Sequence, residues 1–115
     1  MVYFFGGGFT AGNTRREGPQ YMMARDIILV MVSSRLSVFG FLSTADEIIP
    51  GNMGLKDQTE ALRWTNQYIS DYGGDPTRVL IAGHSSGAAC SHLHAYSPLS
   101  NGTLNVVLTF ALISE

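Results

Sequence analysis

A serine lies between two glycines in the segment AGHSSGAAC, which spans Ala82–Cys90. Gly83, Ser85 and Gly87 match the pattern G-x-S-x-G, in which a sharp turn exposes a serine hydroxyl so that it can act as a nucleophile. Because glycine and serine are common, the three fixed positions match by chance in roughly 3 or 4 of a hundred chains of this length. The pattern therefore predicts a nucleophile only if a strand leads into it and a helix follows it.

A glycine-rich stretch upstream could stabilise the negative charge that such a nucleophile creates. Three successive glycines, Gly6 to Gly8, follow a short aromatic run and leave their backbone N–H groups free to approach a carbonyl oxygen. The helix expected after Ser85 would direct the N–H of Ser86 at the same place. Taken alone, the glycines fit a flexible turn equally well, but both stretches occur in the order and setting that an oxyanion site requires.

Hydrophobic patterning predicts the elements that would position these residues. Val79–Ala82 is a short apolar strand that runs into the serine pattern, and Ser86–Tyr96 is a helix-compatible segment. Further strands are predicted at 1–5, at 27–32 and in the latter half of 104–113, and an amphipathic helix at 55–72. The short apolar run 38–42 supports no assignment. This alternation predicts an α/β domain with a mostly parallel sheet.

Composition excludes several classes of function. The chain has 115 residues, of which 45% are hydrophobic and 14% charged, well below the usual quarter for charged residues. A net charge of −2 without blocks of like charge argues against binding to nucleic acid or to anionic membranes. No apolar run is long enough to span a membrane, and no signal-peptide pattern is visible in these residues. The single cysteine, Cys90, is expected to be a small buried side chain.

Five stretches share their order and spacing with a known family over nearly the whole chain. They are Val2–Phe9 (VYFFGGGF), Arg35–Ser43 (RLSVFGFLS), Pro50–Gln58 (PGNMGLKDQ), Tyr72–Pro76 (YGGDP) and Gly83–Gly87 (GHSSG). Together they resemble the type-B carboxylesterases, the carboxylesterase/cholinesterase branch of the α/β-hydrolases, and within that branch the insect esterases. The resemblance implies that residues 1–115 form part of an α/β-hydrolase domain, with an incomplete, mostly parallel sheet.

The resemblance also implies a reaction and the residues that carry it. Ser85 would attack a small carboxylic ester, an acyl-enzyme would form, and water would release the acid without a cofactor or a metal ion. The oxyanion hole would consist of the backbone N–H groups of Gly7, Gly8 and Ser86. The chain departs from the family at His84, where glutamate is usual, at Phe5, where histidine or tyrosine is usual, and at Ser33-Ser34, where Asn-Tyr is usual. The first two changes touch the pocket and could alter selectivity.

The groups that would activate the serine are not evident in the sequence. In this family the acid and then the histidine follow Ser85 along the chain, where only His92, His94 and Glu115 are available. Both histidines lie on the predicted helix that leads away from the hydroxyl, so structural roles are expected for them. His84 adjoins the serine, and a sequence neighbour rarely reaches the geometry of a general base. We expect the acid and the histidine outside these residues, in a longer parent protein of which this chain is an inactive fragment.

Two alternatives to an esterase stay open. The chain could belong to a non-catalytic cholinesterase-like protein used in adhesion or binding, or be an inactive truncation product. Ser85 and the glycine stretch favour the enzyme. Asn101-Gly102-Thr103 is an acceptor pattern for N-glycosylation. It would be used only in a secreted parent protein, and an extracellular location is implied by the resemblance alone.

Overall fold

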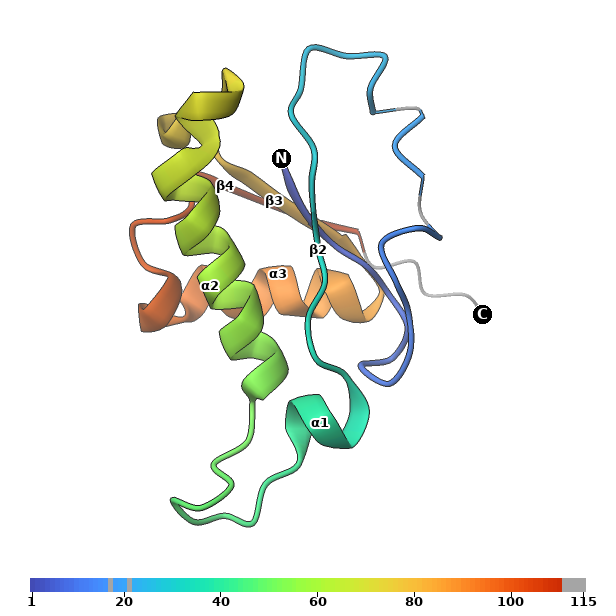
Figure 1. Ribbon diagram of the computed structural model, residues 1–115, viewed down its shortest axis with the longest axis vertical. Helices are drawn as coiled ribbons and strands as arrows, with labels where there is room; N and C mark the ends of the chain where they lie inside the picture. The colour runs from blue at the N-terminus through green and yellow to red at the C-terminus, as the bar shows by residue number, and fades with distance from the viewer. Residues whose placement is uncertain (17, 21, 111–115) are drawn as a thin grey trace.

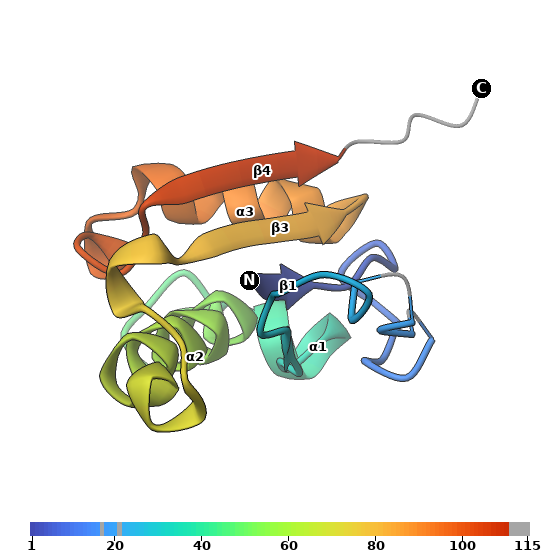
Figure 2. The same cartoon turned by 90° about the horizontal axis from the view of Figure 1, so that it is seen from above.

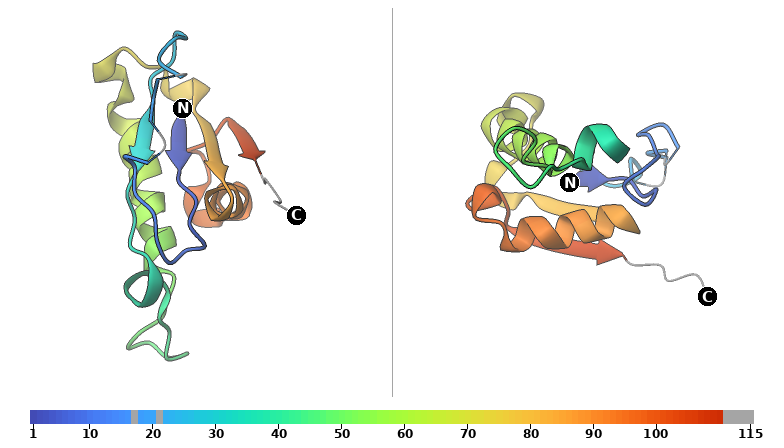
Figure 3. Two further views of the ribbon diagram at one scale, coloured as in Figure 1. Left: turned by 90° about the vertical axis from the view of Figure 1, so that its right-hand side faces the viewer. Right: turned by 90° about the horizontal axis from the view of Figure 1, so that it is seen from below.

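A four-stranded parallel sheet forms the centre of the molecule (Figure 1). The computed structural model describes residues 1–16, 18–20 and 22–110, and of 106–110 the backbone only. The strands are β1 (Val2–Phe4), β2 (Val30–Val32), β3 (Leu80–His84) and β4 (Val106–Phe110). They lie side by side in the order β2-β1-β3-β4, and every neighbouring pair is parallel (Figure 3, left). The predicted α/β class with a mostly parallel sheet is therefore confirmed.

Among the described residues, three α-helices and three short 3-10 helices connect and cover the strands. They are α1 (Ser37–Phe41), α2 (Met53–Tyr68), η1 (Ile69–Tyr72), η2 (Pro76–Arg78), α3 (Ser86–Tyr96) and η3 (Pro98–Ser100). In Figure 2, α3 runs along β3 and β4, whereas α1 and α2 lie closer to β1, near the other half of the strand order. The helix predicted at 86–96 has the observed bounds of α3. The run 38–42, which supported no assignment, lies in α1 up to Phe41.

The core lies between the sheet and the two longer helices. Its buried members are Val2, Phe4, Val32, Leu62, Val79, Ile81 and Cys90. Val2 and Phe4 point to the same side of β1 because side chains alternate along a strand. Each such side chain contributes about 1.5–3 kcal/mol when it is fully removed from water. Cys90 is buried, as predicted.

Two predictions about the elements were wrong in part. The strand predicted at 27–32 is limited to Val30–Val32, because β2 pairs in register only with the three residues of β1. The helix predicted at 55–72 begins earlier, at Met53, and its α-helical part ends at Tyr68. Leu62 is buried, but Trp64 and Tyr68 point away from the core and are 43% and 39% exposed. Two residues along a helix correspond to a turn of about 200° from Leu62, which places Trp64 on the opposite face.

The strand predicted in the latter half of 104–113 is present, but it begins earlier than predicted. β4 occupies Val106–Phe110, in register with β3 from Leu80 to His84. Residues 111–113 of the predicted segment lie outside the described residues. β3 itself extends beyond its predicted end at Ala82 to His84.

Candidate functional site

Ser85 lies on the turn that joins β3 to α3. β3 ends at His84 and α3 begins at Ser86, so a strand leads into the serine and a helix follows it, as predicted. The backbone angles of Ser85 are φ 54° and ψ −121°, a combination that L-residues rarely adopt. Such a conformation costs about 1–3 kcal/mol and persists only where the surrounding structure enforces it. The turn leaves Ser85 exposed at the end of the sheet.

The glycines on either side allow this turn to be tight. A Cβ placed on Gly87 would lie 2.0 Å from the carbonyl oxygen of Phe4, and one on Gly83 would lie 2.3 Å from the carbonyl carbon of Gly87. Both distances are far below a non-bonded contact. The first turn of α3 thus packs directly on the backbone at the end of β1, which no larger residue at position 87 would permit.

The glycine stretch lies directly against the turn that carries Ser85. A Cβ placed on Gly6 would lie 3.2 Å from the Cβ of Ser85 and 2.9 Å from Nδ1 of His84. Gly7 has a φ of 133°, and its carbonyl oxygen accepts hydrogen bonds from the N–H groups of Thr10 and Ala11, both at 3.1 Å. Gly7 and Gly8 are exposed. The structure therefore brings together the two stretches that the sequence pointed to, although Ser85 and Gly6 are separated by almost eighty residues.

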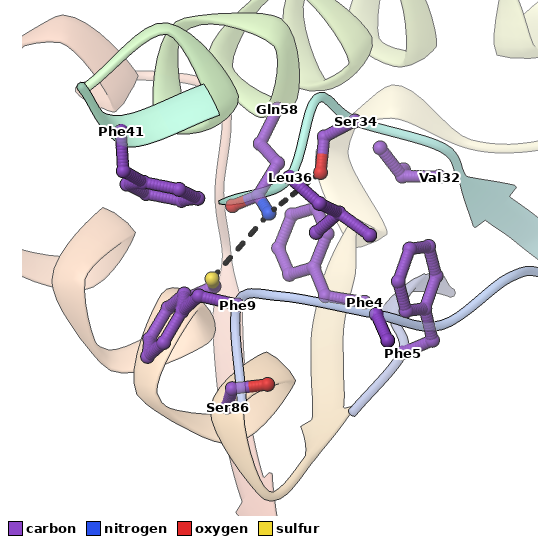
Figure 4. Close-up of a pocket in the computed structure, with 11 residues that line it drawn as sticks. Phe4, Phe5, Phe9, Val32, Ser34, Leu36, Phe41, Gln58 and Ser86 are labelled. Carbon is purple, nitrogen blue, oxygen red and sulfur yellow. Dashed lines mark hydrogen bonds between the residues drawn. The ribbon is translucent and has the colours of Figure 1, made fainter. Parts of the chain in front are cut away.

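A small cavity is lined in part by Phe5 and Phe9, the residues on either side of the glycine stretch (Figure 4). Its apolar lining includes Phe4, Phe5, Phe9, Val32, Leu36 and Phe41. The rings of Phe9 and Phe41 meet edge to face, with their centroids 5.4 Å apart. The polar side chains of Ser34, Gln58, Ser86 and Cys90 border the same cavity. Residues that flank the glycine stretch and residues of α1, α2 and α3 thus line the same cavity.

Comparison with known proteins identifies the family. The profile described as "Carboxylesterase family" matches residues 1–110. The chain belongs to the carboxylesterase family. A juvenile hormone esterase of Tribolium castaneum is 49% identical over 104 residues, covering 89% of this chain and 18% of that protein. A carboxylic ester hydrolase of Bombus ignitus is 47% identical over 102 residues, with the same two coverages of 89% and 18%.

A solved structure agrees with this carboxylesterase fold. The crystal structure of juvenile hormone esterase from Manduca sexta, with OTFP covalently attached, matches with a TM-score of 0.86 and 35% sequence identity. The match covers 96% of this chain and 22% of that protein. The small parallel sheet and its helices therefore correspond to part of an α/β-hydrolase domain, as the sequence indicated. The chain spans about a fifth of the length of these relatives.

The histidines after Ser85 have the structural surroundings expected of them. His94 is buried, and its Nε2 donates to Oε1 of Gln58 at 3.0 Å because an amide oxygen can only accept. Its Nδ1 must then accept from the hydroxyl of Ser100, at 2.7 Å. Burial lowers the pKa of His94 from its ordinary value of 6.5 to about 4, so the ring is neutral at pH 7. His92 is exposed and packs edge to face against Tyr96.

Neither of these histidines lies close to the serine along α3. His94 follows Ser86 by eight residues, which corresponds to about 12 Å along a helix axis. His84, by contrast, lies beside Gly6 at the mouth of the site. The residue that departs from the usual glutamate of the family therefore borders both the serine and the glycine stretch.

Side chains that the sequence patterns did not single out connect α2 to the segments around the site. Asp57 accepts from the backbone N–H and the Nε of Arg35, both at 2.9 Å, and from its Nη2 at 2.8 Å. The hydrogen bonds from Arg35 lower the pKa of Asp57 below its usual value. Gln58 donates to Ser34 and to Cys90. The signal available in the sequence is that the adjacent pair Asp57-Gln58 lies inside the family-like stretch Pro50–Gln58.

Other kinds of site find no support in the part of the chain that the structure describes. Within 1–16, 18–20 and 22–110, no group of three or more His, Cys, Asp or Glu side chains is placed to hold a metal ion. None of the described helices combines the length and the apolar character needed to cross a membrane. Asn101 is exposed directly after η3, in the turn that continues through Gly102. Its glycosylation stays a prediction.

Proposed function

We propose that the chain contributes the nucleophile and the oxyanion hole of a carboxylesterase. The observation that carries this proposal is the strained turn at Ser85, with the glycine stretch packed against its Cβ. Ser37 has the same φ of 54°, so the argument depends on where Ser85 lies, between β3 and α3 and against the glycine stretch. Strained residues at such positions are typical of sites where strain serves function. The family and its esterase relatives supply the substrate class, which is a small carboxylic ester.

The proposed reaction has two steps. The hydroxyl oxygen of Ser85 bonds to the carbonyl carbon, its proton passes to a general base, and the N–H groups of Gly7, Gly8 and Ser86 stabilise the oxyanion. The carbon–oxygen bond to the alcohol then breaks, the alcohol takes up a proton, and an acyl-enzyme remains. Water attacks the acyl carbon in the second step, which releases the acid and restores Ser85. His94 does not supply the base in this proposal, because both of its ring nitrogens are engaged in the interior.

Covalent labelling tests the role of Ser85. The longer parent protein expected to contain this chain is treated with a fluorophosphonate ester, which forms a stable adduct with activated serines. Hydrolysis of p-nitrophenyl acetate by the same protein is followed in parallel. We expect a single adduct on the peptide that carries Ser85, and loss of both adduct and turnover in Ser85→Ala. Ser70→Ala, which changes an exposed serine of η1, is the matched control and should retain both.

The same experiment separates the alternatives. A folded polypeptide that forms no adduct and hydrolyses no ester would contradict the proposal and favour a non-catalytic relative. The 115-residue chain on its own is expected to show negligible turnover. Substantial turnover by the chain alone, abolished by Ser85→Ala, would show that the general base lies within it.

A further inference from the structure

A chain of buried hydrogen bonds runs from α2 through α3 to η3. Gln58 of α2 is 5% exposed and His94 of α3 is 3% exposed. The side-chain amide of Gln58 donates to Sγ of Cys90 at 3.4 Å, and its oxygen accepts from His94 at 3.0 Å. His94 is in turn bound to Ser100 at 2.7 Å. Polar groups buried to this extent are costly unless all are paired, so their geometry is closely constrained.

Gln58 contacts the face of α3 on which Ser86, a proposed donor of the oxyanion hole, also lies. Ser86, Cys90 and His94 recur every four residues and so share one face of α3. Gln58 binds the second and the third of these, and it borders the same cavity as Ser86 (Figure 4). The amide therefore ties α2 to two successive turns of the helix whose first N–H is the proposed donor.

The second donor of Gln58 leads to the other half of the site. Its Nε2 also donates to Oγ of Ser34 at 3.2 Å, in the segment between β2 and α1. Three residues later, the N–H of Ser37 donates to the carbonyl oxygen of Phe9 at 2.7 Å, which anchors the end of the glycine stretch. Gln58 is thus bound both to the helix of Ser86 and to the segment on which the glycine stretch rests.

We propose that Gln58 is a positioning residue for the oxyanion hole, a role that rests on the function proposed above. The donors of Gly7 and Gly8 and the donor of Ser86 belong to segments far apart in the sequence, so tertiary contacts set their separation, the pairing of β1 with β3 among them. Displacement of such groups by about 1 Å can cost 10²-fold in rate. By joining both elements with one rigid amide, Gln58 holds the donors at the separation that the oxyanion requires.

Replacement of Gln58 by methionine isolates this contribution. Methionine is similar in length to glutamine but apolar, so it fills the same space. It removes the hydrogen bonds from the amide to Ser34 and Cys90 and the one that the Nε2–H of His94 donates to it. In Gln58→Met we expect kcat per active site to fall about 10- to 100-fold while KM changes less than about twofold, because the transition state is affected more than ground-state binding. Gln67→Met, at an exposed position of the same helix, is the matched control and should leave both parameters unchanged.

Titration of active sites separates positioning from stability. The polypeptide that contains these residues is titrated with the fluorophosphonate, and p-nitrophenyl acetate kinetics are expressed per labelled site. A lower number of labelled sites with unchanged kcat per site would overturn the inference, because Gln58 would then only stabilise the fold. Failure of the unaltered protein to form any adduct would instead overturn the proposed function and this inference with it.

A second pair of variants decides the matter if Gln58→Met does not fold. Cys90→Ser keeps an acceptor for the amide of Gln58, whereas Cys90→Val has a similar volume and removes it. We expect kcat per labelled site to fall severalfold further in Cys90→Val than in Cys90→Ser. Equal values of kcat per site in the two variants would overturn the inference.

Discussion

Ser85 combines an exposed hydroxyl with a backbone conformation that opposes folding. Its φ of 54° and ψ of −121° suit glycine far better than serine. The strain is enforced by short-range packing, since Gly87 allows α3 to lie on the backbone of Phe4 and Gly6 approaches the Cβ of Ser85. Glycine at this position would stabilise the fold more than serine does, but it would lack the hydroxyl. Such a loss of stability at a residue with a nucleophilic group is expected where function shapes the site.

Ser85→Gly should therefore stabilise the protein. Relief of about 1–3 kcal/mol of strain exceeds the additional unfolded-state entropy of glycine, about 0.5–1 kcal/mol, so we expect a net gain of about 1 kcal/mol. Ser85→Ala keeps the strained backbone and should change stability by less than about 0.5 kcal/mol. Urea unfolding of the two variants provides the comparison, since both remove the hydroxyl. A glycine variant no more stable than the alanine variant would show that the conformation carries no strain.

At the scale of elements, helices and strands were predictable from the sequence where nearby residues determine their ends. The bounds of α3 followed from the small residues after Ser86 and from Ser97-Pro98, which are local features. α1 was not predicted, because it has only five residues and is fixed by tertiary contacts such as the bond from Ser37 to Phe9. Similarly, the short β2 reflects the length of its partner, which its own apolar sequence does not encode.

The backbone features of the candidate site were predictable from the sequence, but the side chains that connect α2 and α3 beside it were not. Glycines at fixed spacing around Ser85, and three more upstream, indicate close backbone approaches through their residue type and spacing alone. The link from Gln58 to His94 joins residues 36 positions apart and depends on how two helices pack. No periodicity predicts such a pair, and both residue types usually lie at the surface or at its boundary.

The packing of α3 on α2 should make stability depend on the protonation of His94. Its pKa of about 4 in the folded state lies below the unfolded value of 6.5, so between these pH values the unfolded chain binds more protons than the folded one. Stability contributed by the neutral ring is fully present above pH 6.5 and is lost as the pH falls towards 4. The expected loss between pH 7 and pH 4 is about 3 kcal/mol.

Urea unfolding at a series of pH values measures this dependence. His94→Leu should be less stable at pH 7, because it leaves Gln58 and Ser100 without their partner, but its stability should change less between pH 6.5 and 4. His92→Leu, which alters an exposed histidine of the same helix, is the control and should retain the dependence of the unaltered protein. An identical slope in all three proteins would contradict the assignment of the effect to His94.

At the scale of the whole molecule, the order of the strands in the sheet could not be predicted from local sequence patterns. Alternation of strands and helices predicts parallel pairing, but each short apolar run could pair with any other. The observed order β2-β1-β3-β4 places β1 at the centre, next to β3 and thus beside the turn that carries Ser85. The glycine stretch reaches the serine because it directly follows this central strand. The resemblance to the carboxylesterases implied a mostly parallel sheet, but neither it nor the patterning predicted this strand order.

The same arrangement predicts that the 115-residue chain self-associates when it is produced alone. Within the described residues, β2 and β4 each pair on one side only, so both expose unpaired backbone groups that can bind another strand. Large apolar side chains add to this tendency, since Phe39, Ile48 and Tyr96 are 82%, 84% and 77% exposed. Sedimentation velocity should show a mean mass that rises with concentration over the micromolar range.

Two variants with the same added charge distinguish pairing at strand edges from general apolar contact. Met31→Lys places a lysine on the edge strand β2, where a charge opposes the addition of a further strand, and should reduce the association. Ile48→Lys places the same charge in an exposed loop and should reduce it less, although it removes a more exposed apolar side chain. If the unaltered chain instead sediments as a monomer at all concentrations and unfolds in one cooperative thermal transition, the exposed edges do not drive association. Equal effects of the two lysines would attribute the association to apolar surface, because only Met31 lies on a strand edge.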